Sequence, residues 1–165
     1  MTTVISMRCA WCQQVIRAAQ TSEDSHGICL DCLPATFLIP VESLKDLSQD
    51  KLDALPYGVV RLDENDCVIE FNNFEVNLAR RRREDVMGKR FFLDVAPCTN
   101  VEQLGGWVRS ARSAGIDAET QVMFVFRFPF GQRLVDLTLS FASASKTVTI
   151  VVREAGAQDG KPASA

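Results

Sequence analysis

The chain has 165 residues, of which 47% are hydrophobic and 24% charged, a composition typical of a soluble globular protein. The net charge of −3 argues against a nucleic-acid partner, and no apolar run is long enough to span a bilayer, so no membrane contact is expected. The N-terminus lacks a basic flank followed by an apolar core, which predicts a cytoplasmic location where thiols stay reduced. The six cysteines therefore need a role other than disulfide formation.

Four of the six cysteines form two CxxC pairs near the N-terminus. Cys9 and Cys12 make the first pair, and Cys29 and Cys32 follow after 16 intervening residues. Two thiolates from each pair complete a tetrahedral zinc site. A segment this short buries too little apolar surface to fold alone, so metal binding would supply its folding energy. The pattern predicts a structural, zinc-ribbon-like module over residues 1–39.

His26 and redox chemistry leave alternatives open for this module. The two pairs could instead be redox-active or simply packed. His26, the single histidine, lies just before the second pair and could replace a cysteine as ligand or orient one from outside the ligand set. Four thiolates already fill the site, so a turn position is expected for His26, and its ligation of zinc stays open.

Beyond residue 39 the pattern predicts one α+β domain over 40–154. The expected elements are, in chain order, short helices within 43–55, strands over 57–62 and 67–71, short helices over 72–79 and 83–87, a longer helix over 101–114, and strands over 120–128, 134–142 and 147–153. Turns are expected at 63–66, 129–132 and 143–146. This order describes a five-stranded antiparallel sheet with helices on one face. The Gly-, Ala- and Ser-rich stretch 155–165 predicts a disordered tail.

A lone cysteine ends the apolar run that begins at Phe91. Cys98 follows Pro97, which fixes the backbone before it, and on chemistry alone it would be a packed core thiol. The surrounding residues favour another role. The informative ones are Leu52-Asp53-Ala54-Leu55, Gly58, Leu62-Asp63, Asn72, Glu75, Gly88-Lys89, Phe91-Phe92 and Asp94-Val95-Ala96-Pro97-Cys98-Thr99. In these residues 44–99 resembles the photoactive yellow protein family of PAS domains, and the likeness continues weakly to 153.

The resemblance implies a chromophore and residues that hold it. In this family the matching cysteine carries p-coumaric acid as a thioester, which assigns that role to Cys98 inside a dry cavity, next to Pro97. Glu75 matches the glutamate that donates a hydrogen bond to the phenolate, and Arg81 matches an arginine that shields the chromophore from solvent. Light-driven isomerisation moves a proton from the glutamate and loosens an N-terminal cap, here 41–55.

Three departures from the family pattern affect the expected site. Phe71 stands where the family has a tyrosine that donates a second hydrogen bond, and Ala79 replaces a supporting threonine. The hairpin at 128–133 is also about two residues shorter. Losing one of two donors to a buried anion removes roughly 1.5–3 kcal/mol of its stabilisation. A bound chromophore is therefore expected to have a raised phenol pKa and to absorb at shorter wavelength, unless the pocket takes another ligand.

The resulting functional prediction is a cytoplasmic sensory protein that passes a signal to a downstream protein and is not an enzyme. No histidine other than His26 could act as a general base, and no phosphate-binding glycine loop is present. The alternative is a non-photoactive PAS module for interaction, ligand binding or redox sensing, with a structural zinc site. The arginines at 80–83 are expected to form a solvated face, with the gate role of Arg81 second. The oligomeric state is left open, a homodimer being one expectation.

Overall fold

The computed structural model describes residues 5–8, 15–19 and 40–155, and the chain divides into two units, Met1–Ile39 and Pro40–Ala165. In the first unit, β1 (Ile5–Arg8) pairs antiparallel with β2 (Val15–Ala19). The first CxxC pair lies between these strands in the sequence. All four predicted ligands (Cys9, Cys12, Cys29 and Cys32), His26 and residues 156–165 of the expected tail lie outside the described residues, so the zinc site and the disordered tail stay predictions.

No helix among the described residues is long and apolar enough to cross a membrane. They also contain no group of three or more histidine, cysteine, aspartate or glutamate side chains placed to hold a metal ion.

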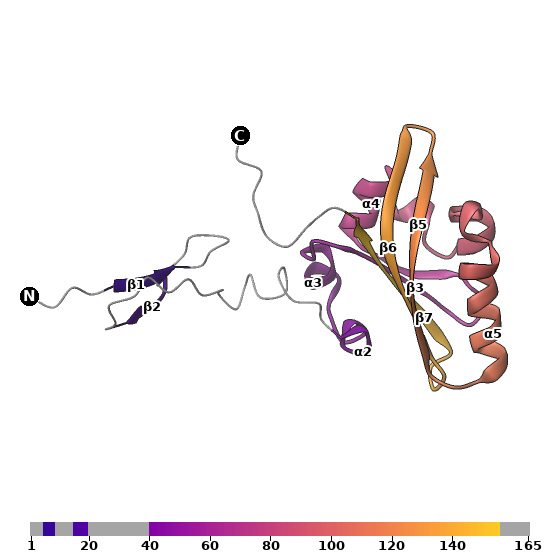
Figure 1. Cartoon of the computed structure of the whole chain (residues 1–165), viewed down its shortest axis with the longest axis horizontal. Helices are drawn as coiled ribbons and strands as arrows, with labels where there is room; N and C mark the ends of the chain where they lie inside the picture. The colour runs from indigo at the N-terminus through magenta and orange to yellow at the C-terminus, as the bar shows by residue number, and fades with distance from the viewer. Residues whose placement is uncertain (1–4, 9–14, 20–39, 156–165) are drawn as a thin grey trace, which may run out of the picture. The chain divides into compact units, whose positions relative to one another are not determined.

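The second unit is built on a five-stranded antiparallel sheet in the order β4-β3-β7-β6-β5, which confirms the predicted α+β class (Figure 1). Every neighbouring pair of strands in it is antiparallel. The strands are β3 (Gly58–Leu62), β4 (Val68–Phe71), β5 (Ala118–Phe128), β6 (Gly131–Ala142) and β7 (Thr147–Glu154). The hairpin between β5 and β6 turns on Pro129 and Phe130 alone, two residues fewer than the predicted turn, because β6 begins at Gly131.

Short helical segments connect the strands. They are α2 (Val41–Leu44), α3 (Gln49–Asp53), α4 (Asn73–Ala79), a 3₁₀ turn η1 (Arg83–Asp85), a π-helical turn η2 (Phe91–Val95), a 3₁₀ turn η3 (Pro97–Thr99), a second π-helical turn η4 (Glu102–Gly106) and α5 (Trp107–Ala114). The helix predicted over 101–114 is thus confirmed in place, but its first turn is π-helical. Gly115, with φ of 66°, ends α5 in the left-handed conformation that glycine adopts at no steric cost.

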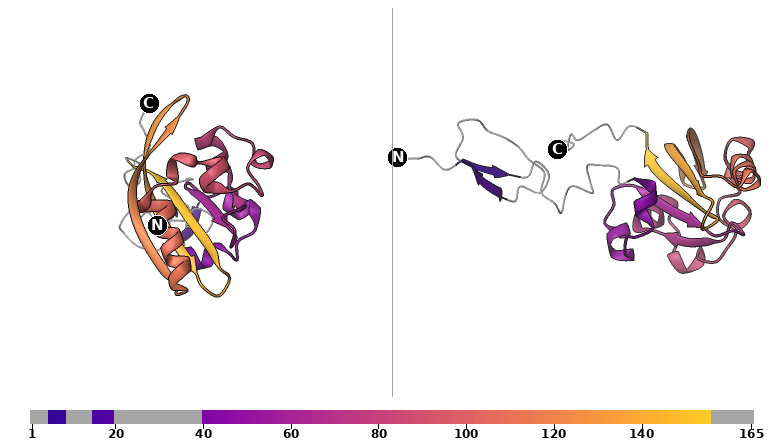
Figure 2. Two further views of the ribbon diagram at one scale, coloured as in Figure 1. Left: turned by 90° about the vertical axis from the view of Figure 1, so that its right-hand side faces the viewer. Right: turned by 90° about the horizontal axis from the view of Figure 1, so that it is seen from below.

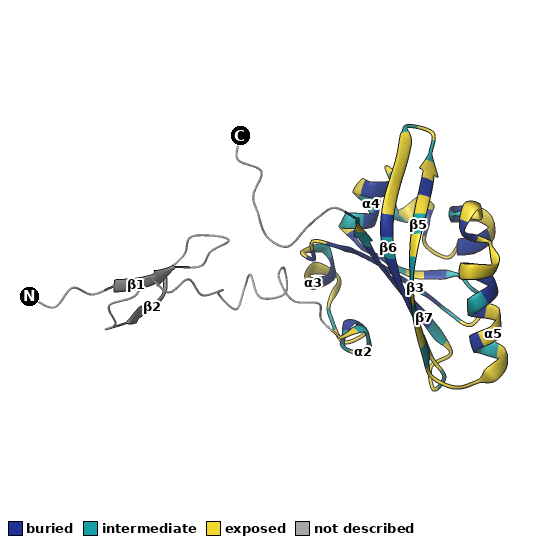
Figure 3. Cartoon of the chain, viewed as in Figure 1, coloured by how far each residue is buried: buried dark blue, intermediate teal, exposed yellow. Residues whose placement is uncertain are grey.

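The main hydrophobic core lies between the inner face of the sheet and the segments from α4 to α5 (Figure 3). Alternation along the strands produces it, because successive side chains of a strand point to opposite faces. In β6, for example, Val135, Leu137, Leu139 and Phe141 are all buried. The core is completed by aromatic side chains from the turn at Phe91–Val95 and by Leu104 and Val108.

A second group of buried apolar side chains lies outside this core cluster. Val59 and Val151 are register partners on β3 and β7, and their odd positions place them on the outer face, opposite Val60 and Ile150. Both are fully buried, as are Leu44 and Leu52 of α2 and α3. The two helices lie on the opposite side of the sheet from α5 (Figures 1 and 2). The prediction of helices on one face is therefore incomplete: α2 and α3 cover the outer face of β3 and β7.

Candidate ligand site around Glu75 and Cys98

Helix α4 places an acidic side chain in the apolar core. Asn72 caps the helix by accepting a hydrogen bond from the Glu75 amide (3.3 Å), which fixes Glu75 in the first turn. The Glu75 residue is only 5% exposed, and its Oε1 atom is buried without a hydrogen-bond partner among the described residues. Burial raises the pKa of Glu75 to about 8. The side chain is therefore mostly a neutral carboxylic acid at pH 7, able to donate a hydrogen bond.

Gly58 at the start of β3 makes the room that this acid occupies. A methyl group at position 58 would overlap Glu75 Oε1 and would lie 2.8 Å from its carboxyl carbon. The same methyl group would meet Cβ of Val152, the register partner of Gly58, at 3.0 Å. The absence of a side chain at this position therefore lets the carboxyl group lie directly against the inner face of the sheet.

The side chain of Asn72 joins α4 to the segment before β3. Its Nδ2 donates to the carbonyl oxygens of Leu52 (2.8 Å) and Tyr57 (2.9 Å), and its Oδ1 accepts from the amide of Val59 (3.0 Å) as well as from Glu75. Asn72 is fully buried, so these bonds form away from water. Any displacement of Glu75 and the first turn of α4 would therefore strain or break hydrogen bonds to α3 and β3.

Arg83 makes a second connection between the same segments. Its guanidinium contacts Asp53 at the end of α3 at 2.6 Å and donates to the carbonyl oxygen of Phe71 at 2.7 Å. Asp53 also accepts from the Asn73 amide at 2.8 Å. The basic cluster at 80–83 is thus not a uniform solvated face, because one of its members ties α3 to the end of β4.

Phe71 occupies the position where a second donor was expected from the family pattern. Its ring is 1% exposed and belongs to the main core. A phenyl ring donates no conventional hydrogen bond, so this position offers only apolar contact. Of the two positions at which the family has a hydrogen-bond donor, 71 on β4 and 75 on α4, only Glu75 can donate here.

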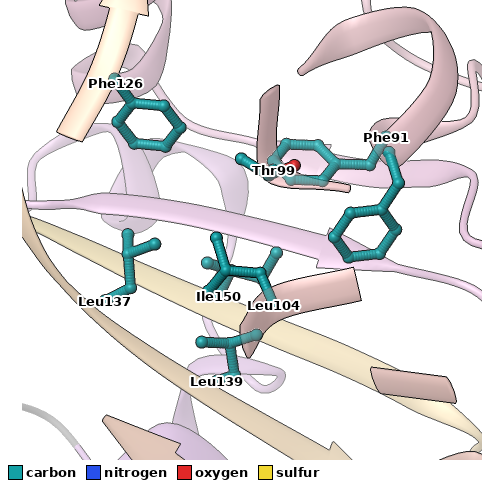
Figure 4. A pocket seen from close by; sticks show the side chains of 8 residues that line it. Phe91, Thr99, Leu104, Phe126, Leu137, Leu139 and Ile150 are labelled. Carbon is teal, nitrogen blue, oxygen red and sulfur yellow. The ribbon is translucent and has the colours of Figure 1, made fainter. Parts of the chain in front are cut away.

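A small apolar cavity lies in the core, lined by aromatic and aliphatic side chains (Figure 4). Its lining comes from η2 to η4 and from strands β5 to β7: Phe91, Phe92, Thr99, Leu104, Phe126, Leu137, Leu139 and Ile150. The Thr99 hydroxyl already donates to the carbonyl of Ala96 at 2.6 Å. A cavity of about 10 Å³ holds no more than a single water, so a hydroxycinnamoyl group would require these side chains to move apart.

Cys98 adjoins this cavity in sequence but does not lie inside it. The 3₁₀ turn Pro97–Thr99 buries Thr99 in the cavity wall and leaves Pro97 and Cys98 exposed. The expectation of a thiol inside a dry cavity is therefore wrong for this structure. The short turn can direct only one of these neighbouring side chains inward, and it is Thr99. An exposed thiol is accessible to an acylating reagent, so the position suits attachment better than enclosure.

Arg80, the neighbour of the predicted shielding residue Arg81, lies over an aromatic ring. The shielding role of Arg81 itself stays a prediction. The Arg80 guanidinium lies 4.1 Å from the centre of the Phe130 ring, and Phe130 stacks on Phe128 at 5.0 Å. Phe128 in turn stacks on Phe126, which lines the cavity. Arg81 is exposed. A row of rings thus leads from the cavity to Arg80, and a shielding role fits that residue's position.

Sequence reasoning quoted Gly58 and Asn72 as matching positions without assigning them a role, and it missed Arg83. An asparagine just before a predicted helix is a recognisable N-cap signal. Its bonds to Leu52 and Tyr57 were not foreseeable, because they join segments that only the folded chain brings together. Arg83 belongs to a run of four arginines, and the sequence does not show which of the four side chains the fold turns towards α3.

Comparison with known proteins supports the family suggested by these residues. No family model matches the chain. The photoactive yellow protein of Rhodothalassium salexigens is 31% identical over 111 residues, covering 67% of this chain and 88% of that protein, and the one from Halochromatium salexigens is 29% identical over the same shares. The crystal structure of the photoactive yellow protein domain of the sensor histidine kinase Ppr from Rhodospirillum centenum matches with a TM-score of 0.65 and 28% identity, covering 70% of this chain and all of that one. The five-stranded unit is thus a PAS-like sensory domain, and the chain belongs to the photoactive yellow protein family.

Proposed function

We propose that this protein is a light sensor that carries p-coumaric acid as a thioester on Cys98, with Glu75 as the proton donor to the chromophore. The observation that carries the proposal is a carboxyl group, buried in the same domain as an accessible thiol, whose Oε1 atom has no hydrogen-bond partner in the described part of the chain. An unsatisfied buried polar atom costs free energy. A ligand with a phenolic oxygen would remove that cost.

The residues present suit such a ligand on three counts. The Glu75 acid can donate to a phenolate, and a hydrogen bond to a charged acceptor is stronger than a neutral one. The core cavity that Thr99 lines is apolar, and the adjacent residue Cys98 is exposed to an activated acyl donor. A bound hydroxycinnamoyl group would supply light absorption and an ionisable phenol. With Phe71 offering no second donor, the phenol pKa is expected to be raised and the absorption shifted to shorter wavelength.

Loss of the Glu75 proton would alter the structure around α3. A buried carboxylate without a partner is costly by several kcal/mol. The first turn of α4 that holds Glu75 is bonded through Asn72 to Leu52 and Tyr57. Rearrangement of that turn would weaken these bonds and loosen the segment 41–55. The proposed output is altered contact of this segment, or of a zinc-bound N-terminal module, with a downstream signalling protein in the cytoplasm.

The direct test is reconstitution of the full chain with an activated p-coumarate. Intact-protein mass should rise by one acyl group, and an absorption band of the chromophore should appear. Cys98→Ala should abolish the mass increase and the absorption band. Cys67→Ala, which removes a half-buried thiol just before β4, should leave both in place. An unchanged mass for the wild-type chain would reject the chromophore. Labelling that survives Cys98→Ala would reject the attachment site.

A second candidate is a redox or ligand-sensing PAS module without chromophore. The exposure of Cys98 and the small cavity favour it. Mild peroxide should then produce a sulfenic acid at Cys98 that dimedone traps, and Cys98→Ala should lose the adduct. In the same preparation, metal analysis of the full chain tests the zinc proposal for Cys9, Cys12, Cys29 and Cys32. About one zinc per chain is expected, with loss on Cys9→Ser.

A further inference from the structure

Strand β5 is an edge of the sheet, and every second residue along it is exposed. It has 11 residues, Ala118–Phe128, and within the described residues it pairs with β6 alone. In Figure 2 the β5–β6 hairpin forms the outer margin of the domain. A long, unpaired edge strand presents free backbone donors and acceptors to another strand, and proteins normally block such edges.

The direction of the free backbone groups follows from the ladder. The Ala155 amide donates to the carbonyl of Leu134 (3.0 Å), so the even-numbered residues of β6 bond towards β7. The odd-numbered residues of β6 therefore bond to β5, where their register partners are even-numbered, as Val135 is paired with Phe124. It follows that the odd-numbered residues of β5, from Glu119 to Arg127, direct their N–H and C=O groups to the free edge.

The side chains of these same odd-numbered residues are all exposed. They are Glu119, Gln121, Met123, Val125 and Arg127. Met123 is the midpoint of the strand and is 56% exposed. Val125 and its register partner Leu134 on β6, 39% and 50% exposed, extend this apolar surface across the hairpin. Large exposed apolar side chains that adjoin one another mark interaction surfaces.

The charges at the two ends of this row are complementary to a second copy of the row. If two β5 strands pair antiparallel with Met123 opposite Met123, all 11 residues overlap, and Glu119 lies opposite Arg127. A shift by two residues in either direction keeps the backbone pattern but separates these charges and shortens the overlap. Directly opposed pairs of opposite charge stabilise antiparallel strands, and like charges destabilise them.

We propose that two copies of this chain associate through their β5 edges, forming one continuous ten-stranded sheet about a two-fold axis at Met123. Each copy places Glu119 against the partner's Arg127, so the contact is isologous and closes at a dimer. The exposed Met123, Val125 and Leu134 of both copies then form one apolar strip on the outer face. The proposal is independent of the chromophore and concerns the protein in its unloaded form.

Charge reversal provides a test with internal controls. Sedimentation velocity of the full chain over a concentration series should show a monomer–dimer equilibrium. Glu119→Arg or Arg127→Glu should each weaken dimerisation about tenfold, because each places like charges opposite one another twice per dimer. Arg133→Glu makes the same charge change on β6, away from the free edge, and should leave the dimer unchanged.

Two further samples distinguish the proposed register from any other effect of charge. An equimolar mixture of Glu119→Arg and Arg127→Glu should form heterodimers as strongly as wild type, since every opposed pair is again of opposite sign. The double variant, which has the composition of the wild type, should recover its homodimer. A monomeric wild type at every concentration overturns the proposal. A dimer that tolerates both single reversals, or that the mixture fails to restore, overturns it as well.

Discussion

The two halves of the PAS-like unit depart from the usual distribution of residues in opposite ways. The half formed by β3, β4, β7, α3 and α4 buries Asn72 and Glu75, and it holds the partly buried Arg61–Glu70 ion pair (2.8 Å). The β5–β6 half exposes three large apolar side chains on one face, Met123, Val125 and Leu134, whereas the strands of the first half expose one, Ile69. Buried polar groups and exposed apolar patches are the informative exceptions in a globular protein. In our proposals, the first half would sense a ligand within the domain, and the second would make contact outside it.

Two glutamates of the first half, Glu70 and Glu75, differ in whether the fold gives them a partner. Glu70 is half-buried on β4, and burial raises its pKa while the facing Arg61 lowers it. For Glu75 burial is the single cause of a pKa of about 8. Glu70 has a partner in the fold already, whereas Glu75 Oε1 has none among the described residues. An acid held without a partner is available to a ligand.

The largest expected effect is the pH dependence that Glu75 imposes on the unloaded protein. Below its ordinary value of 4.5 the carboxyl is protonated in both the folded and the unfolded chain. As pH rises, the unfolded chain loses this proton first, so Glu75 lowers the free energy of unfolding until pH passes the folded pKa of about 8. The full difference is on the order of 5 kcal/mol.

Glu75→Gln removes this dependence without changing the shape of the side chain. Urea unfolding from roughly pH 5 to pH 9 should show the variant gaining stability over wild type across that window. Contributions of the other titrating groups cancel in the difference. A difference that stays constant with pH would mean that Glu75 is ionised in the folded protein.

Truncation of matched leucines compares the covered and the open outer faces. Leu52→Ala should cost about 3 kcal/mol, because Leu52 of α3 is fully buried. Leu134→Ala removes the same atoms from a half-exposed side chain and should cost less than about 0.5 kcal/mol in the monomer. Denaturant titration at low protein concentration measures both. Equal losses would show that the open half is covered in solution.

Removal of the buried amide at position 72 tests the link between Glu75 and α3. Asn72→Ala leaves the Leu52 and Tyr57 carbonyls and the Val59 amide without their partner, at an expected cost of about 2–3 kcal/mol. The control Asn77→Ala, on the exposed side of α4, should change stability by less than about 0.5 kcal/mol. Amide exchange should also rise within α3 in the first variant only. Unaltered amide exchange within α3 would contradict the proposed link between Glu75 and α3.

The smallest expected effect separates the two neighbouring arginines. Arg80→Ala should lose about 0.5–1 kcal/mol through its contact with the Phe130 ring. Arg81→Ala should be neutral, because Arg81 is exposed and contacts no aromatic ring among the described residues. In the chromophore-loaded protein, iodide or a bleaching reagent should also reach the chromophore faster in Arg80→Ala than in wild type. The reverse order would support the shielding role predicted for Arg81.

Much of the fold was predictable because local patterns determine it. Strand-like runs between turn signals identified the strands of the sheet, Gly115 marked the end of α5, and the acidic turn at 63–66 separated β3 from β4. The π-helical turns at Phe91–Val95 and Glu102–Gly106 were not predictable, since tertiary packing selects them over α-helix. The outer position of α2 and α3 depends on long-range burial against Val59 and Val151, which no local pattern encodes.

Residues of the candidate site were predictable only where the residue type itself suggests a chemical role. Glu75 and Cys98 were identified from the resemblance, and burial of the acid is consistent with its expected role. The exposure of Cys98 was missed because a three-residue turn determines which of two neighbours faces inward. The contact of Arg80 with Phe130 depends on the positive φ of Arg80 (51°), which ends α4 and redirects the chain. Neither feature has a periodic signature.

The central claim is that Glu75 is held as a neutral acid for a phenolic partner, and infrared difference spectroscopy tests it most directly. The account predicts that subtracting the Glu75→Gln spectrum from the wild-type spectrum at pH 7 leaves the C=O band of a protonated carboxylic acid, which shifts when p-coumarate is attached at Cys98. The difference spectrum of an ionised carboxylate at pH 7, unchanged by attachment, would contradict it.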